Sequence, residues 1–191
     1  MKSISMQDKT ILTILGYFLI FTVLVNILIH IKIWNDWKEI FWYCNFAGLF
    51  CGVGLINKNN KLISAVLFTS VVQTLWIADY FLNFLGLGMG RTEQLFEMFP
   101  LPVFLLSTIL HGSIIPLSIY GTYKLGYSKK SFFNGILIFL IALPVTYYLT
   151  DQSENINCVF YPCDLTFKED YELIISNTSY MTEKYLLWVM V

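Results

Sequence analysis

Long apolar runs separated by short polar stretches dominate this chain. A helix needs roughly 20 apolar residues to cross a bilayer core of about 30 Å, and a helix suits that core because it pairs its own backbone N–H and C=O groups. Five segments meet this test and predict spanning helices over residues 10–32, 39–57, 62–86, 99–123 and 131–150. The pattern therefore predicts an all-α, polytopic transmembrane helical bundle that forms a single domain over residues 1–191.

The C-terminal stretch "YLLWVMV" begins like a sixth span and ends well short of a crossing. We therefore expect either a short, partial sixth helix or an end that docks on the bundle. Pro116 and Pro144 lie inside apolar segments, where the missing N–H and the proline ring kink a helix. Such kinks are common in membrane bundles and carry no functional meaning on their own.

Composition agrees with a membrane protein. Hydrophobic residues make up 57% of the chain and charged residues 13%, with a mean hydropathy of +0.64, whereas soluble domains carry about 25% charged residues. The 16 Phe, 12 Tyr and 5 Trp suit a surface that meets lipid tails and head groups. A net charge of −1, without a long Lys/Arg cluster, gives no basis for nucleic-acid binding. The expected partner is the lipid bilayer.

The distribution of basic residues predicts the orientation. With five alternating spans, the loops on the N-terminal side carry Lys2, Lys9, Lys58, Lys61, Lys124, Lys129 and Lys130, and the opposite loops carry Lys32, Lys38, Arg91, Lys168 and Lys184. Basic residues are enriched in cytoplasmic loops, so this modest excess favours a cytoplasmic N-terminus. We expect an integral protein of the plasma (inner) membrane of a prokaryote.

Ionisable residues inside spans are costly and are candidate site residues by default. Asp79 lies in the third segment on one helical face with Tyr80 and Asn83, and His111 lies midway along the fourth. With the predicted orientation, Asp79 and Asn83 fall in the outer half of the membrane, as do His30, Cys44 and Asn45. The inner half is almost purely apolar, which predicts a polar cavity that opens outward.

A carboxylate beside an imidazole shifts both titrations, which suits general acid/base chemistry or proton-coupled transport. Asp79 and His111 are therefore the predicted catalytic pair. The predicted substrate-binding residues line the cavity or its outer mouth: Trp42, Cys44, Asn45, Trp76, Asn83, Asp151, Glu154, Asn155 and Asn157.

Other chemistry has weaker support. A metal site built from His111, Asp79 and Cys44 lacks the paired ligand spacing typical of zinc enzymes, so both the metal and any cofactor stay undefined. Ser107 with His111 and Asp79 could form a hydrolase triad, but helical proteins offer such trios by chance. Polar side chains within spans also bridge helices through hydrogen bonds worth about 1 kcal/mol, which is the structural alternative.

The cysteines fall into two pairs. Cys158 and Cys163 lie in "CVFYPC", outside the cell in the predicted orientation, where they either close a short disulfide or stay as two thiols. Cys44 and Cys51 share one helical face within the membrane, which indicates packing residues rather than a redox pair.

Several short motifs resemble a group of small bacterial multi-span membrane proteins that has no assigned activity. The motifs are "FWYCN", "QTLWIAD", "HGSIIP", "LGYSKK" and "ENIN", which together extend over most of residues 40–157. The matching positions are Trp42, Cys44, Trp76, Asp79, His111, Pro116, Gly126, Tyr127, Glu154, Asn155 and Asn157. The chain departs from this group at Cys158, where the group has an aromatic residue, and in its short last helix. The resemblance implies a multi-span architecture and no substrate.

Three functions stay open at this point. The first is an outward-facing cavity, formed by Asp79, His111 and Cys44, that binds or modifies a lipid-like or amphiphilic molecule. The second is a proton- or cation-coupled transporter or channel subunit, and the third is a structural or assembly subunit, as a homo-oligomer or with a membrane-complex partner. An enzyme should lose activity and keep its stability on Asp79→Asn or His111→Ala, whereas residues that only bridge helices should lose stability first.

Overall fold

The computed structural model describes residues 4–35, 37–87, 99–151 and 156–159. These residues form six α-helices and two short 3-10 helices, with no strand among them. The chain divides into two compact units, Met1–Gly135 and Ile136–Val191. The all-α prediction is confirmed for the described part of the chain, and a single domain over all 191 residues stays a prediction.

Three helices are long and apolar enough to cross a membrane: α1 (Met6–Trp34), α6 (Leu101–Leu125) and α7 (Ser131–Leu149). They match the predicted spans 10–32, 99–123 and 131–150, and they contain Pro116 and Pro144 as expected. Their length and composition indicate a membrane protein.

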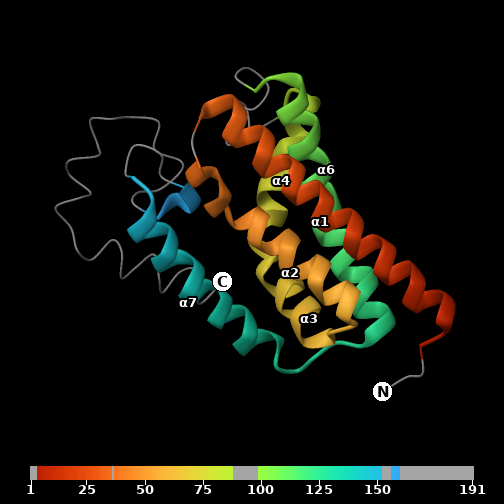
Figure 1. Cartoon of the computed structure of the whole chain (residues 1–191). Helices are drawn as coiled ribbons and strands as arrows, with labels where there is room; N and C mark the ends of the chain where they lie inside the picture. The colour runs from red at the N-terminus through yellow and green to blue at the C-terminus, as the bar shows by residue number, and fades with distance from the viewer. Residues whose placement is uncertain (1–3, 36, 88–98, 152–155, 160–191) are drawn as a thin grey trace. The chain divides into compact units, whose positions relative to one another are not determined.

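α1 has a defined start and end (Figure 1). The Ser5 hydroxyl accepts a hydrogen bond from the backbone N–H of Asp8 at 3.0 Å, which caps the first turn. Asn35 adopts a left-handed conformation with φ 53° and ends the helix. The 29 residues of α1 extend over about 43 Å at 1.5 Å per residue, which is the thickness of a bilayer with its head groups.

The second apolar segment forms a shorter helix than the predicted span 39–57. A 3-10 helix, η1 (Trp37–Phe41), comes first, and α2 (Tyr43–Asn57) begins only after Trp42. The Asn45 side chain donates to the backbone carbonyl of Glu39 at 3.0 Å, which holds η1 against the first turn of α2. At 1.5 Å per residue α2 is about 22 Å long, less than the 30 Å hydrocarbon core.

The third apolar segment divides at Ser70 into α3 (Asn60–Thr69) and α4 (Val71–Phe84). Neither Pro nor Gly occurs in this stretch. Instead, the Thr69 hydroxyl lies 3.2 Å from the Ala65 carbonyl and 3.0 Å from the Val66 carbonyl, and it also accepts a hydrogen bond from Tyr43. A threonine hydroxyl that bonds the preceding turn favours a bend, and at Thr69 it also accepts the bond from α2, at the point where the predicted span 62–86 divides.

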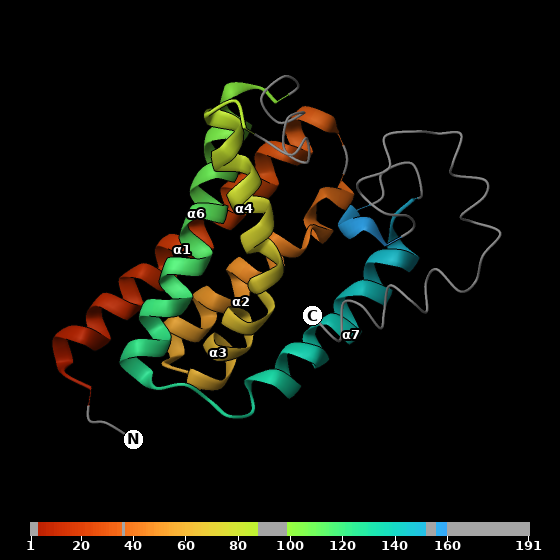
Figure 2. The ribbon, with the colours of Figure 1, turned by 180° about the vertical axis from the view of Figure 1, so that it is seen from behind.

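Within the Met1–Gly135 unit, α1, α2 and α6 lie side by side in both views (Figures 1 and 2). α1 and α2 approach closely at two glycines, because a Cβ atom at Gly16 would lie 2.7 Å from the Gly52 carbonyl oxygen. Leu19, Val23 and Leu110 are fully buried. Large apolar side chains on other faces are exposed, among them Tyr17 at 61% and Phe21 at 68%, as expected for a surface that meets lipid.

The described part of the Ile136–Val191 unit contains the rest of α7 and a 3-10 turn, η2 (Ile156–Cys158). Asn157 has a φ of 56°, and its side-chain amide donates to the Thr146 hydroxyl at 3.2 Å. This bond attaches η2 to α7.

Candidate functional site

A connected group of polar side chains lies where α1 ends and α2 begins. We call it the His30 cluster, and its members are Asn26, His30, Glu39, Trp42 and Asn45. Asn26 and His30 lie one helical turn apart on α1, so they share a face. The turn after Trp34 brings η1 back against that face, which places Glu39 beside His30.

Glu39 is the centre of the His30 cluster. Its Oε2 atom lies 3.0 Å from Nδ1 of His30 and accepts a hydrogen bond from the indole N–H of Trp42 at 2.9 Å. An ionised carboxylate only accepts hydrogen bonds, so Nδ1 of His30 carries a proton and donates it to Glu39. In a neutral imidazole the other ring nitrogen, Nε2, then has a free lone pair. This is the arrangement in which a carboxylate fixes the tautomer of a functional histidine.

Nε2 of His30 is buried and has no hydrogen-bond partner among the described residues. Two aromatic rings lie against the imidazole: Trp34 with a centroid distance of 4.8 Å and Phe99 with one of 6.0 Å. Those two rings also contact each other at 5.2 Å. A buried polar atom without a partner is costly and rare, so this nitrogen needs an explanation.

The amides of Asn26 and Asn45 extend the His30 cluster toward the middle of α1. Asn26 Nδ2 donates to Asn45 Oδ1 over a long 3.4 Å, and both residues are buried. The side-chain amide oxygen of Asn26, Oδ1, has no partner among the described residues. The cluster therefore has two unpaired acceptors, one amide oxygen and one imidazole nitrogen.

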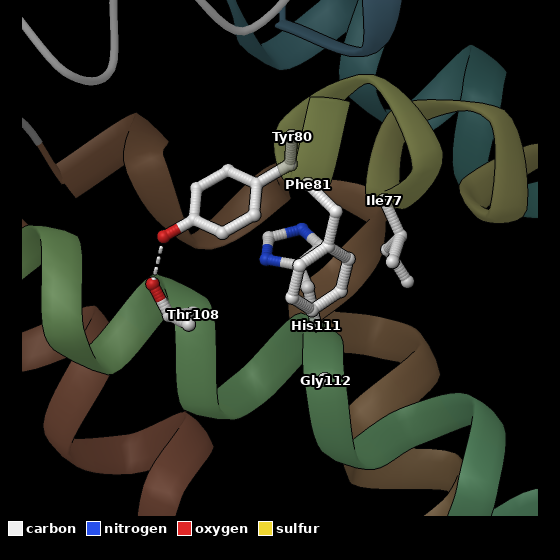
Figure 3. A pocket seen from close by; sticks show the side chains of 6 residues that line it. All are labelled: Ile77, Tyr80, Phe81, Thr108, His111 and Gly112. Atoms are coloured by element: carbon white, nitrogen blue, oxygen red, sulfur yellow. Dashed lines mark hydrogen bonds between the residues drawn. The ribbon is translucent and has the colours of Figure 1, made fainter. Parts of the chain in front are cut away.

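A small pocket lies beside His111 on α6 (Figure 3). Nδ1 of His111 lies 2.8 Å from the backbone carbonyl of Ser107, in the preceding turn. The pocket has a volume of about 10 Å³, which is the space of about one water molecule. Its lining residues are Ile77, Tyr80, Phe81, Thr108, His111 and Gly112, and Asp79 and Cys44 are not among them.

Asp79 is fully buried on α4, and its Oδ2 atom accepts a 3.4 Å hydrogen bond from Asn83. Ile77, Tyr80 and Phe81 of α4 line the pocket with His111, and the Tyr80 hydroxyl bonds Thr108 (Figure 3). Since each helical residue turns by about 100°, Asp79 lies about 150° around α4 from the middle of these three side chains. The structure thus places Asp79 and His111 on different sides of α4, and their joint catalytic role stays a prediction.

The other predicted site residues do not form one site in the described part of the chain. Trp42 and Asn45 belong to the His30 cluster, and Cys44 is a half-buried free thiol on α2. Asp151 is exposed after α7. The Trp76 side chain, Glu154, Asn155, the Cys158 side chain and Cys163 lie outside the described residues. The predicted disulfide and two of the four residues of the predicted outer mouth therefore lie outside them too.

Within the described residues, no group of three or more His, Cys, Asp or Glu side chains is placed to hold a metal ion. Sequence reasoning included His30 among the polar residues but did not select it or Glu39 as site residues. Glu39 stands at the edge of an apolar segment, three residues before Trp42, where its side chain can return to the end of the preceding helix. That position in the sequence was the signal by which Glu39 could have been selected as a site residue.

Comparison of the chain with protein-family models, with curated proteins and with solved structures finds no match.

Proposed function

We propose that this chain is a multi-pass membrane protein with five spans and a cytoplasmic N-terminus. The His30 cluster then lies at the outer face, where it binds the head group of a lipid-like, amphiphilic molecule. The single observation that carries this proposal is the buried, unpartnered Nε2 of a histidine whose other ring nitrogen is fixed by Glu39. The likeness to small bacterial multi-span proteins stays a prediction beside it.

Packing supports five spans rather than three. α2 packs against both α1 and α6, which are long enough to cross, and α3 also packs against α6. A helix packed along two spanning helices lies at membrane depth with them. α3 and α4 together extend over residues 60–84, enough for a crossing despite the division at Ser70.

The site supports binding better than catalysis by Asp79 and His111. The pocket beside His111 has room for about one water molecule, and Asp79 is not among its lining residues. The His30 cluster, in contrast, combines a fixed imidazole, aromatic rings and a position near a helix end. One observation favours a second, structural function: the members of the His30 cluster bond one another and so also join α1, η1 and α2.

Native mass spectrometry of the purified protein in a mild detergent tests the binding function. We expect a retained amphiphile on the wild type and its loss in His30→Leu. The control is Ser118→Ala, because Ser118 is a buried residue of α6 that contacts Cys51 Sγ at 3.4 Å, about 26 Å along the helix from its first residue, Leu101. This control should lose stability and keep the amphiphile. A wild type without any amphiphile, together with lower thermal stability in His30→Leu, would favour the structural function.

A further inference from the structure

We infer that the molecule bound at His30 has a hydrogen-bond donor in its head group, a hydroxyl or a primary ammonium, which donates to Nε2. This inference rests on the proposed function and names the ligand class for the same site. It follows from the chemistry of one nitrogen atom, the depth of that atom in the bilayer and the residues that cover it.

In the neutral imidazole with its proton on Nδ1, Nε2 is an acceptor. Both N–H groups that reach Glu39, from His30 and from Trp42, meet the same carboxylate oxygen, Oε2. The carboxylate is thus used as an acceptor twice and keeps the His30 proton on Nδ1. A lone pair on Nε2 is satisfied by an O–H or N–H group. A bare phosphate oxygen is a poor partner for that lone pair, because two acceptors would then face each other.

The depth agrees with a lipid head group. His30 is four residues from the end of α1 at Trp34, which is about 6 Å along the axis. Trp34 is 39% exposed and Trp37 is 52% exposed, and tryptophans gather at the level of the head groups in membrane proteins. A lipid of the same leaflet therefore presents its head group at the height of the His30 imidazole.

The two aromatic rings over the imidazole limit access to Nε2, and they offer a second way to bind a head group. Trp34 and Phe99 pack on the imidazole, so a head group reaches Nε2 only when one ring moves. Trp34 is the last residue of α1 and is partly exposed, so it can move with the least loss of packing. The same rings could attract a quaternary ammonium through cation–π contact. A choline head group has no N–H or O–H donor, which makes it the discriminating ligand.

The experiment measures the affinity of the full-length protein in detergent for three short-chain lipids, by native mass spectrometry titration. Phosphatidylglycerol offers hydroxyls, phosphatidylethanolamine offers a primary ammonium, and phosphatidylcholine offers no donor. We expect the first two to bind about ten-fold more tightly than the third, as for one hydrogen bond to a buried group. His30→Leu should remove this preference. Glu39→Gln should weaken it, since an amide can donate to Nδ1 as well as accept from it and no longer fixes the tautomer.

The outcomes separate the two proposals. Binding of none of the three lipids overturns the proposed function itself. Equal binding of all three, or tightest binding of phosphatidylcholine, overturns the donor inference and leaves the binding function standing. A ten-fold preference that survives in a folded His30→Leu places the donor contact elsewhere and also overturns the inference. If His30→Leu does not fold, the comparison of the three lipids on the wild type and on Glu39→Gln still tests the donor inference.

Discussion

Glu39 holds two N–H donors on one oxygen atom at the end of α1, and this makes it the residue on which the His30 cluster depends. Removal of its carboxylate by Glu39→Ala leaves Nδ1 of His30 and the indole N–H of Trp42 without their acceptor. A fully buried donor that loses its partner costs about 1–3 kcal/mol, and these two part-buried donors should cost up to that much each. We therefore expect a clearly lower free energy of unfolding, measured by thermal or denaturant unfolding in detergent.

Asp8→Asn is the matched control for Glu39→Ala. Asp8 accepts from the ammonium group of Lys124 at 2.8 Å, and these two side chains are 24% and 27% exposed, so water and salt partly screen the ion pair. Its loss should change the unfolding temperature much less than the loss of Glu39. Equal effects of the two substitutions would contradict a central role for Glu39.

At the residue scale, the sequence predicts which polar residues are buried better than it predicts which side chains contact one another. Burial of Asp79 and a half-buried His111 follow from their positions inside apolar segments. Which side chain faces which depends on the rotation of each helix, and that rotation is set by packing against neighbours. The contact between His30 and Glu39 depends on the turn after Trp34, whose geometry no periodic pattern specifies.

At the scale of elements, close packing of α1 on α2 requires two glycines. A Cβ atom at Gly16 would meet the Gly52 carbonyl oxygen and the Ile56 side chain, each at 2.7 Å. A backbone atom cannot move aside as a side chain can, so Gly16→Ala should force the helices apart and destabilise the protein by about 1–3 kcal/mol. Thermal unfolding in detergent measures the change.

The control is Gly112→Ala on α6, where a Cβ atom would meet nothing within 4 Å. Alanine is the better helix former by about 1 kcal/mol, so this variant should be as stable as the wild type or more stable. A stable Gly16→Ala variant would show that α1 and α2 do not pack as described.

The bend at Ser70 gives a second prediction for an element. Tyr43 donates to Thr69, whose hydroxyl bonds the preceding turn. A double-mutant cycle of Tyr43→Phe and Thr69→Val should give a coupling energy of about 0.5–1.5 kcal/mol in unfolding experiments, as for other hydrogen bonds between membrane helices. Additive effects would mean that the two hydroxyls do not interact.

Element boundaries show where the pattern of apolar residues is informative. Uninterrupted apolar runs predicted α1, α6 and α7 to within a few residues, because length and hydropathy alone define a long span. The late start of α2 and the division at Ser70 coincide with side-chain hydrogen bonds to the backbone, by Asn45 and Thr69. Hydropathy does not register such bonds.

At the scale of the whole molecule, five spans and three spans differ at one loop. With five spans, Asn59 between α2 and α3 is cytoplasmic, whereas with α1, α6 and α7 alone it lies on the same side as Asn35. An alkaline phosphatase fusion after Asn59 should therefore be inactive, while a fusion after Asn35 should be active, because this reporter folds only outside the cytoplasm. Activity at both sites would exclude the five-span topology.

The most direct test of head-group binding at the His30 cluster is a high-resolution structure of the protein in a lipid nanodisc. We predict density from a lipid or lipid-like molecule within about 3 Å of Nε2 of His30, with Glu39 still bonded to Nδ1. A protein side chain or backbone group bonded to Nε2, with the rings of Trp34 and Phe99 closed over it, would contradict this function and leave the cluster with a structural role.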